Sequence, residues 1–117
     1  HALAREICAH YVDETHTLRV VTVDPALEQE ILDAISRADT GEFIPLSPER
    51  ADLVAERTAQ AVQPLLLQGM EPVILTSAPV RRFYKRIVER HVPKIVVLSL
   101  NEIDPAVKLE SEGQVTL

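Results

Sequence analysis

The sequence is poor in cysteine, aromatic residues and glycine. Its 117 residues include one cysteine (Cys8), no tryptophan, two tyrosines, two phenylalanines and three glycines. A lone cysteine cannot form an internal disulfide and is typical of a reducing compartment such as the cytosol. Scarce aromatic rings and a net charge of −6 argue against nucleic-acid binding, which uses basic patches and stacking rings. We therefore expect no nucleic acid among the partners.

Long apolar runs are also missing. The longest, such as residues 95–98, are far shorter than the ~20 residues of a membrane-spanning helix. No signal peptide opens the chain, so we expect this fragment to lie in the cytosol without direct membrane contact. The chain begins at His1 and its single methionine is Met70, so we expect a piece of a longer protein. Apolar residues (46%) and charged residues (26%) are in the proportions of one folded domain.

Three short segments rich in β-branched and apolar residues predict buried strands. They cover residues 18–23, 73–76 and 95–100. Helical spacing of apolar residues predicts helices between them. Strands that alternate with helices favour right-handed crossovers. The predicted fold class is therefore α/β, with a small, mostly parallel sheet of about three central strands flanked by helices.

Helix boundaries are marked by polar caps, prolines and a glycine. Asp24, Ser47 and Ser77 are predicted N-caps, each followed by proline within two residues. Pro64 is expected to kink or end the helix that begins near Ser47, and Gly69 to stop it. Further predictions concern the ends and one loop: a helix over residues 2–12, a short edge strand over 43–46, and a closing hairpin over 108–117 around Glu112-Gly113.

Polar residues follow each predicted strand, where ligands of open parallel sheets bind. They include Asp24, Ser77 and Asn101. For Asp24 and Ser77, the helix-cap interpretation is favoured over a ligand site. No glycine-rich loop or Walker lysine follows a strand, so a phosphate cradle is not predicted. A phosphoacceptor receiver domain would need an acidic pair, and only Asp24 is in place. A small-molecule or nucleotide site at this rim remains the alternative.

No catalytic constellation stands out. Ser77, His91 and Asp24 could form a triad on paper, but Ser77 lacks the glycine-flanked elbow that exposes such a nucleophile. Neither the histidines nor Cys8 has zinc-ligand spacing. We therefore predict no catalytic residue, no metal and no cofactor, and a protein that is not an enzyme.

Basic residues are concentrated in the helix that follows Ser77. Half of all Lys and Arg lie there, on the face opposite the apolar stripe. One interpretation is a solvated face whose cations suit a helix C-terminus. The other is a basic patch on an acidic domain, fitted to an acidic surface of a partner. The predicted partner-binding residues are Arg81, Arg82, Lys85 and Arg86.

Three stretches, in this order and spacing, resemble the C-terminal cytosolic part of the flagellar type III export-gate family (FlhA-like) and its injectisome relatives. The resemblance runs from about residue 2 to residue 117. Asn101-Glu102 after Leu98-Ser99 is more similar to the flagellar branch, although flagellar members usually carry Tyr where this chain has Leu100. The injectisome branch is the near alternative. The stretches are residues 11–13 with 21–29, residues 72–77 with 81–83 and 87–90, and residues 97–103.

The resemblance implies a role in protein export without catalysis. Residues 1–13 would be the helical end of a preceding subdomain and residues 14–117 the C-terminal α/β subdomain. The parent protein would span the bacterial inner membrane, with its cytosolic region forming a homo-oligomeric ring at the cytoplasmic face. Expected partners are chaperone–substrate complexes and components of the export ATPase complex, with no cofactor.

Overall fold

The computed structural model describes residues 17–37 and 46–117. The predicted helix over residues 2–12 lies outside this described part, as do Cys8, three of the four histidines and most of the predicted edge strand over 43–46. The proposed boundary between residues 13 and 14 lies there too, and stays a prediction.

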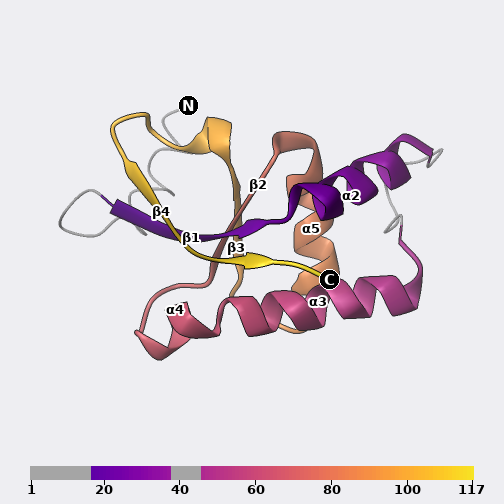
Figure 1. Cartoon of the computed structure of the whole chain (residues 1–117), viewed down its shortest axis with the longest axis horizontal. Coiled ribbons are helices and arrows are strands. Elements are labelled where there is room, and N and C mark those ends of the chain that lie inside the picture. The colour runs from indigo at the N-terminus through magenta and orange to yellow at the C-terminus, as the bar shows by residue number, and fades with distance from the viewer. Residues whose placement is uncertain (1–16, 38–45) are drawn as a thin grey trace.

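Four parallel strands form one sheet in the order β3-β2-β1-β4 (Figure 1). They are β1 (Thr17–Val23), β2 (Val73–Thr76), β3 (Val96–Ser99) and β4 (Lys108–Val115). The first three match the strands predicted from apolar, β-branched runs. The prediction of a small, parallel α/β sheet is confirmed, and the C-terminal segment adds a fourth strand.

The predicted hairpin over residues 108–117 is wrong. Instead, β4 runs as one strand beside β1, from the pair Thr17–Lys108 to the pair Val23–Val115. Val20 lies opposite Ser111 and Val21 opposite Gly113, so Glu112 is an extra residue in the ladder. The Glu112-Gly113 signal therefore marks a bulge and not a turn. Parallel pairing along all of β1 gives this segment more backbone hydrogen bonds than a two-stranded hairpin of the same residues could form.

Four α-helices and one 3₁₀ turn connect the strands within the described residues. The helices are α2 (Pro25–Arg37), α3 (Pro48–Ala61), α4 (Gln63–Leu67) and α5 (Ala78–Val88). The turn η1 (Leu100–Glu102) follows β3. Buried residues of all four helices belong to one apolar cluster, which also holds side chains from one face of the sheet. The core is therefore a helical layer packed on a sheet layer.

Strand side chains alternate between this cluster and a smaller one on the other face of the sheet. In β1, Val21 and Val23 join the helix-covered cluster, whereas Leu18 and Val20 join the second. The second cluster also includes Ile103, which follows η1. Burial on both faces explains why the strands are apolar almost throughout.

The predicted helix boundaries at Asp24, Ser47, Pro64 and Gly69 are confirmed. The Asp24 carboxylate accepts from the Ala26 N–H at 3.0 Å, and the Ser47 hydroxyl accepts from the Arg50 N–H at 3.3 Å. Pro64 occupies the first turn of α4, after the chain breaks from α3. Gly69 has φ 75°, a left-handed conformation that glycine adopts without strain.

A buried hydrogen bond joins α3 to α5. The Tyr84 and Thr58 hydroxyl oxygens are 2.6 Å apart, and both residues are fully buried. Thr58 donates its only hydroxyl hydrogen to the Val54 carbonyl at 2.7 Å. Tyr84 must therefore donate to Thr58. Burial raises the pKa of Tyr84, an effect that the Thr58 hydrogen bond opposes.

We expect stability to fall at alkaline pH partly because of Tyr84. Its folded-state pKa is raised, so its contribution is complete below the unfolded pKa of about 10 and is lost as the pH rises above that value. Tyr84→Phe should therefore show a flatter fall in the free energy of unfolding between about pH 9 and 11. Urea titrations of both proteins across this range measure the difference. Parallel profiles would contradict the assignment.

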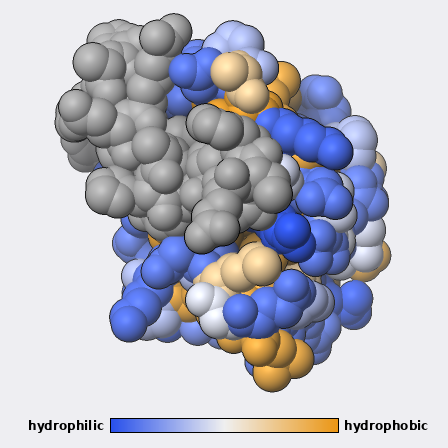
Figure 2. Space-filling view, turned by 90° about the vertical axis from the view of Figure 1, so that its left-hand side faces the viewer, coloured by the Kyte–Doolittle hydropathy of each residue, from blue (hydrophilic) through white to orange (hydrophobic). Residues whose placement is uncertain are grey.

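The helix α4 ends in exposed leucines. The exposed fraction is 43% for Leu66 and 84% for Leu67, whereas Leu65 is fully buried. Helix α4 lies at the lower left of Figure 1. Figure 2, which shows that left-hand side of the molecule, has a hydrophobic projection at its lower edge. None of the helices in the described part of the chain is long and apolar enough to span a membrane.

Candidate functional site

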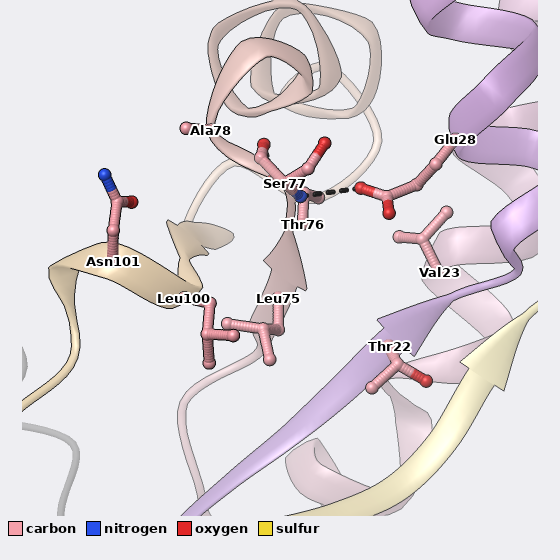
Figure 3. Close-up of a pocket in the computed structure, with 9 residues that line it drawn as sticks. All are labelled: Thr22, Val23, Glu28, Leu75, Thr76, Ser77, Ala78, Leu100 and Asn101. Atoms are coloured by element: carbon pink, nitrogen blue, oxygen red, sulfur yellow. Dashed lines mark hydrogen bonds between the residues drawn. The ribbon is translucent and has the colours of Figure 1, made fainter. Parts of the chain in front are cut away.

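A pocket of about 690 Å³ lies at the carboxyl ends of β1 and β2 (Figure 3). This is the edge at which the sequence predicted a ligand rim. Ser77 and Asn101, two of the three predicted rim residues, line it, and Asp24 does not. The lining residues are Thr22, Val23, Glu28, Leu75, Thr76, Ser77, Ala78, Leu100 and Asn101.

Ser77 directly precedes α5, but its side chain does not cap the helix. The Glu28 carboxylate of α2 accepts from the Ser77 backbone N–H at 2.6 Å, which Figure 3 shows as a dashed line. The Ser77 hydroxyl is buried without a hydrogen-bond partner in the described structure. Ser77 therefore stands at the predicted start of the helix, but the side-chain cap predicted for it is not formed. Its hydroxyl bonds to no amide of the first turn, and a carboxylate from a distant helix accepts from its own backbone N–H. No local sequence pattern marks Glu28 for this role.

The turn η1 is held by a dense polar network. One oxygen of Glu102 accepts from the Ser99 backbone N–H (2.9 Å), the Ser99 hydroxyl (2.9 Å) and Arg81 Nε (2.8 Å). Ser99 Oγ also contacts the Asn101 amide oxygen. Leu100 lies within this turn and is 61% exposed. The network therefore fixes the wall of the pocket that carries Leu100 and Asn101.

The four predicted partner-binding residues do not have equivalent surroundings. Arg81 Nε donates to the Val97 carbonyl at 3.0 Å, and Lys85 Nζ donates to the Ile95 carbonyl at 3.4 Å. The Arg82 guanidinium lies over the Phe83 ring, 5.3 Å from its centroid. Arg86 is exposed near the end of α5. Arg81 and Lys85 are therefore bonded to the backbone beside and within β3, and Arg82 and Arg86 are exposed.

The triad of Ser77, His91 and Asp24 is not assembled. Ser77 precedes the first turn of α5, whereas His91 follows its last turn and lines a second pocket of about 610 Å³ at the other end of the helix. Eleven helical residues, about 16 Å, separate the two. Asp24 caps α2. Within residues 17–37 and 46–117, no three His, Cys, Asp or Glu side chains are grouped closely enough to hold a metal ion.

Comparison with known proteins shows the family of this chain: the model of the FHIPEP family matches residues 1–108. The chain belongs to the FHIPEP family.

Curated relatives of this FHIPEP chain come from both flagellar and virulence systems. It is 32% identical to the flagellar biosynthesis protein FlhA of Bacillus subtilis over 116 residues, covering 99% of the chain and 17% of that protein. It is 34% identical to the invasion protein InvA of Salmonella typhimurium over 102 residues, covering 87% of the chain and 15% of that protein. The chain thus spans about a sixth of the length of these relatives.

Solved structures of similar proteins share the fold. Nonameric EPEC SctV-C matches with a TM-score of 0.82 and 28% identity, covering 97% of this chain and 34% of that chain. The Chlamydia pneumoniae CdsV protein in its complex with CdsO matches with a TM-score of 0.82 and 27% identity, covering 98% and 34%. The resemblance to type III export gates inferred from the three sequence stretches is therefore confirmed at the level of the family.

Proposed function

We propose that this FHIPEP chain is a non-catalytic docking unit in the cytosolic ring of a type III protein export gate. Chaperone–substrate complexes and components of the export ATPase complex would bind the ring, which would lie at the cytoplasmic face of the bacterial inner membrane. The observation that carries the proposal is the family match over residues 1–108. Relatives named for flagellar biosynthesis and invasion support the export role.

Ring formation and partner binding are proposed by analogy with the solved neighbours. SctV-C is described as nonameric, and CdsV was solved with CdsO. The test is a pull-down of chaperone–substrate complexes by the longer cytosolic region, with and without residues 14–117. Loss of capture on deletion, with the oligomer retained, would support docking by this unit. Full capture without it would contradict docking and leave a purely structural role.

The flagellar branch is our proposal for the export system, with the injectisome branch as the alternative. Asn101-Glu102 after Ser99 supports the flagellar assignment, and InvA at 34% identity supports the other. Two chimeras separate them: this chain replaces the matching segment of Bacillus subtilis FlhA or of Salmonella InvA. Reinsertion of the native segments at the same junctions is the control. Swimming restored without restored virulence secretion would support the flagellar branch, and the reverse would overturn it.

The basic face of α5 remains the proposed partner surface. Arg82 and Arg86 are exposed members of this face. The double charge reversal Arg82→Glu with Arg86→Glu should reduce swarming or secretion at least about tenfold, because like charges across an interface weaken association. The control is the reversal Arg90→Glu with Lys94→Glu at the exposed end of the same segment.

Circular dichroism and urea unfolding of both double variants show whether the fold is retained. Normal export by the folded Arg82/Arg86 variant would remove these residues from the proposed surface. Equal defects in both variants would show that total charge matters and not this site.

A second candidate function is small-molecule binding in the pocket lined by Ser77 and Asn101. Its position at the strand ends favours it, whereas the bond from Glu28 to the Ser77 amide opposes a phosphate there. Thermal shifts with nucleotides and phosphorylated metabolites test it. A ligand at 100 times its Kd should add about 2.7 kcal/mol to the free energy of unfolding. No shift with any compound would count against this candidate.

A further inference from the structure

The strand β3 forms one edge of the sheet. It pairs with β2 along Val96–Ser99, and no strand in the described part of the chain lies on its other side. An open edge presents backbone N–H and C=O groups that another chain can pair with, and this is a route to aggregation. Whether these N–H and C=O groups already have hydrogen-bond partners therefore decides whether another chain can pair with the edge.

Alternate residues of β3 face opposite directions. The Val96 N–H donates to the Pro72 carbonyl at 2.9 Å, so the backbone of Val96 faces β2. The backbone groups of its neighbours Ile95 and Val97, and of Ser99, then face away from β2, because the direction alternates along a strand. These three residues make up the outer edge.

Backbone groups along that outer edge are hydrogen-bonded to side chains and to a turn of the same chain. The Ile95 N–H donates to the Val92 carbonyl at 3.0 Å, and the Ile95 carbonyl accepts from Lys85 Nζ at 3.4 Å. The Val97 carbonyl accepts from Arg81 Nε at 3.0 Å. The Ser99 N–H donates to the Glu102 carboxylate at 2.9 Å. The outward carbonyls of Ile95 and Val97 are thus bonded to cations of α5.

Arg81 is itself fixed in place. Its Nε is shared between the Val97 carbonyl and Glu102, whose carboxylate also holds Ser99. The exposed fractions of the Arg81 and Glu102 side chains are 42% and 24%. The guanidinium therefore links α5, β3 and η1. These contacts within the chain give Arg81 a structural role that needs no partner protein.

The two edges of the sheet differ in their own charges. The opposite edge strand β4 carries Lys108, Glu110 and Glu112, and charged side chains discourage pairing with another chain. Residues 96–99 of β3 are Val, Val, Leu and Ser, with no charge and no proline. An uncharged, apolar edge is prone to strand pairing unless something covers it.

We infer that Arg81 and Lys85 close the β3 edge and prevent it from pairing with a strand of another chain. Two of the four predicted partner-binding residues, Arg81 and Lys85, then bind the backbone of their own chain. Partner binding is left to the rest of the basic face of α5. This inference does not depend on the proposed export function.

The test replaces both donors by methionine, which keeps an unbranched stem and the helix but cannot donate. Arg81→Met with Lys85→Met should raise the self-association constant of the 117-residue chain at least about tenfold, a change of about 1.4 kcal/mol. Analytical ultracentrifugation measures association, and infrared spectroscopy detects intermolecular strands. The matched control, Arg90→Met with Lys94→Met, makes the same charge change at exposed positions and should associate like the unchanged chain.

Two results would overturn the inference. One is a folded Arg81/Lys85 variant as monodisperse as the unchanged chain. The other is equal association of the control, which would assign the effect to net charge. If the double variant does not fold, the single variants decide, because each opens one carbonyl: association should increase in each relative to the unchanged chain, and no increase in either folded single variant would equally overturn it.

Discussion

Replacing Tyr84 by alanine is expected to lower the free energy of unfolding by about 3–5 kcal/mol, the range typical of buried aromatic residues. Tyr84 heads the fully buried side chains when these are ranked by size, and it packs α5 against the cluster beneath the helices. Its removal would leave a large cavity between α3 and α5. Because small domains are only marginally stable, this one change would remove a large share of the total stability.

Two milder substitutions separate the ring from its hydroxyl. Tyr84→Phe keeps the ring, and Thr58 keeps its bond to Val54, so we expect a loss of about 1 kcal/mol. Thr58→Val should cost about 1–3 kcal/mol, since it leaves the Tyr84 hydroxyl buried without its partner. Urea unfolding of Tyr84→Ala, Tyr84→Phe, Thr58→Val and the double variant Thr58→Val with Tyr84→Phe measures the loss of stability in each case. A Tyr84→Ala variant no less stable than Tyr84→Phe would contradict the packing argument.

Leu65→Ala is expected to lower the free energy of unfolding by about 2–5 kcal/mol. Leu65 is the one buried residue of the short helix α4, and it belongs to the main cluster. A helix of five residues has little stability of its own, so its attachment depends on this side chain. The chain between α3 and β2 should therefore detach locally in this variant.

Leu67→Ala is the matched control for that prediction. It makes the same chemical change two residues further along α4, at a side chain that is 84% exposed. It should change the free energy of unfolding by no more than about 0.5 kcal/mol. Urea unfolding gives the global effect, and amide hydrogen exchange over residues 63–70 detects local detachment. Equal losses in the two variants would show that α4 is not held by Leu65.

Features set by neighbouring residues could be predicted from the sequence. The run at residues 73–76, apolar except for Thr76, became β2 with the same bounds, because side chains on both of its faces are packed. Asp24 and Ser47 act as caps because a short polar side chain can reach amides only two or three residues away. Pro64 interrupts the helix that begins at Pro48, since its missing N–H is tolerated in a first turn but not in a helix interior. These effects need no knowledge of the rest of the fold.

Features that depend on contacts between residues far apart in the chain could not be predicted from the sequence. Glu112-Gly113 has the composition of a turn, and only the presence of β1 alongside turns it into a bulge. Ser77 has the sequence context of a cap, but its hydroxyl bonds to no amide of α5, and the carboxylate that meets its backbone N–H comes from Glu28, 49 residues away. The sequence placed the rim at the strand ends correctly for Ser77 and Asn101. It did not reveal that Arg81 and Lys85 reach the backbone at β3.

The pairing of β1 with β4 has a consequence for how the domain forms. Thr22 bonds to the Gly113 carbonyl, 91 residues along the chain, and β1 pairs with β4 along its full length. During synthesis, β1 leaves the ribosome long before its outer neighbour exists, and one side of that strand stays unpaired in the meantime. Contacts so distant in sequence also slow folding, because the closure entropy must be overcome first. Completion of the sheet is therefore expected to be a late step of folding.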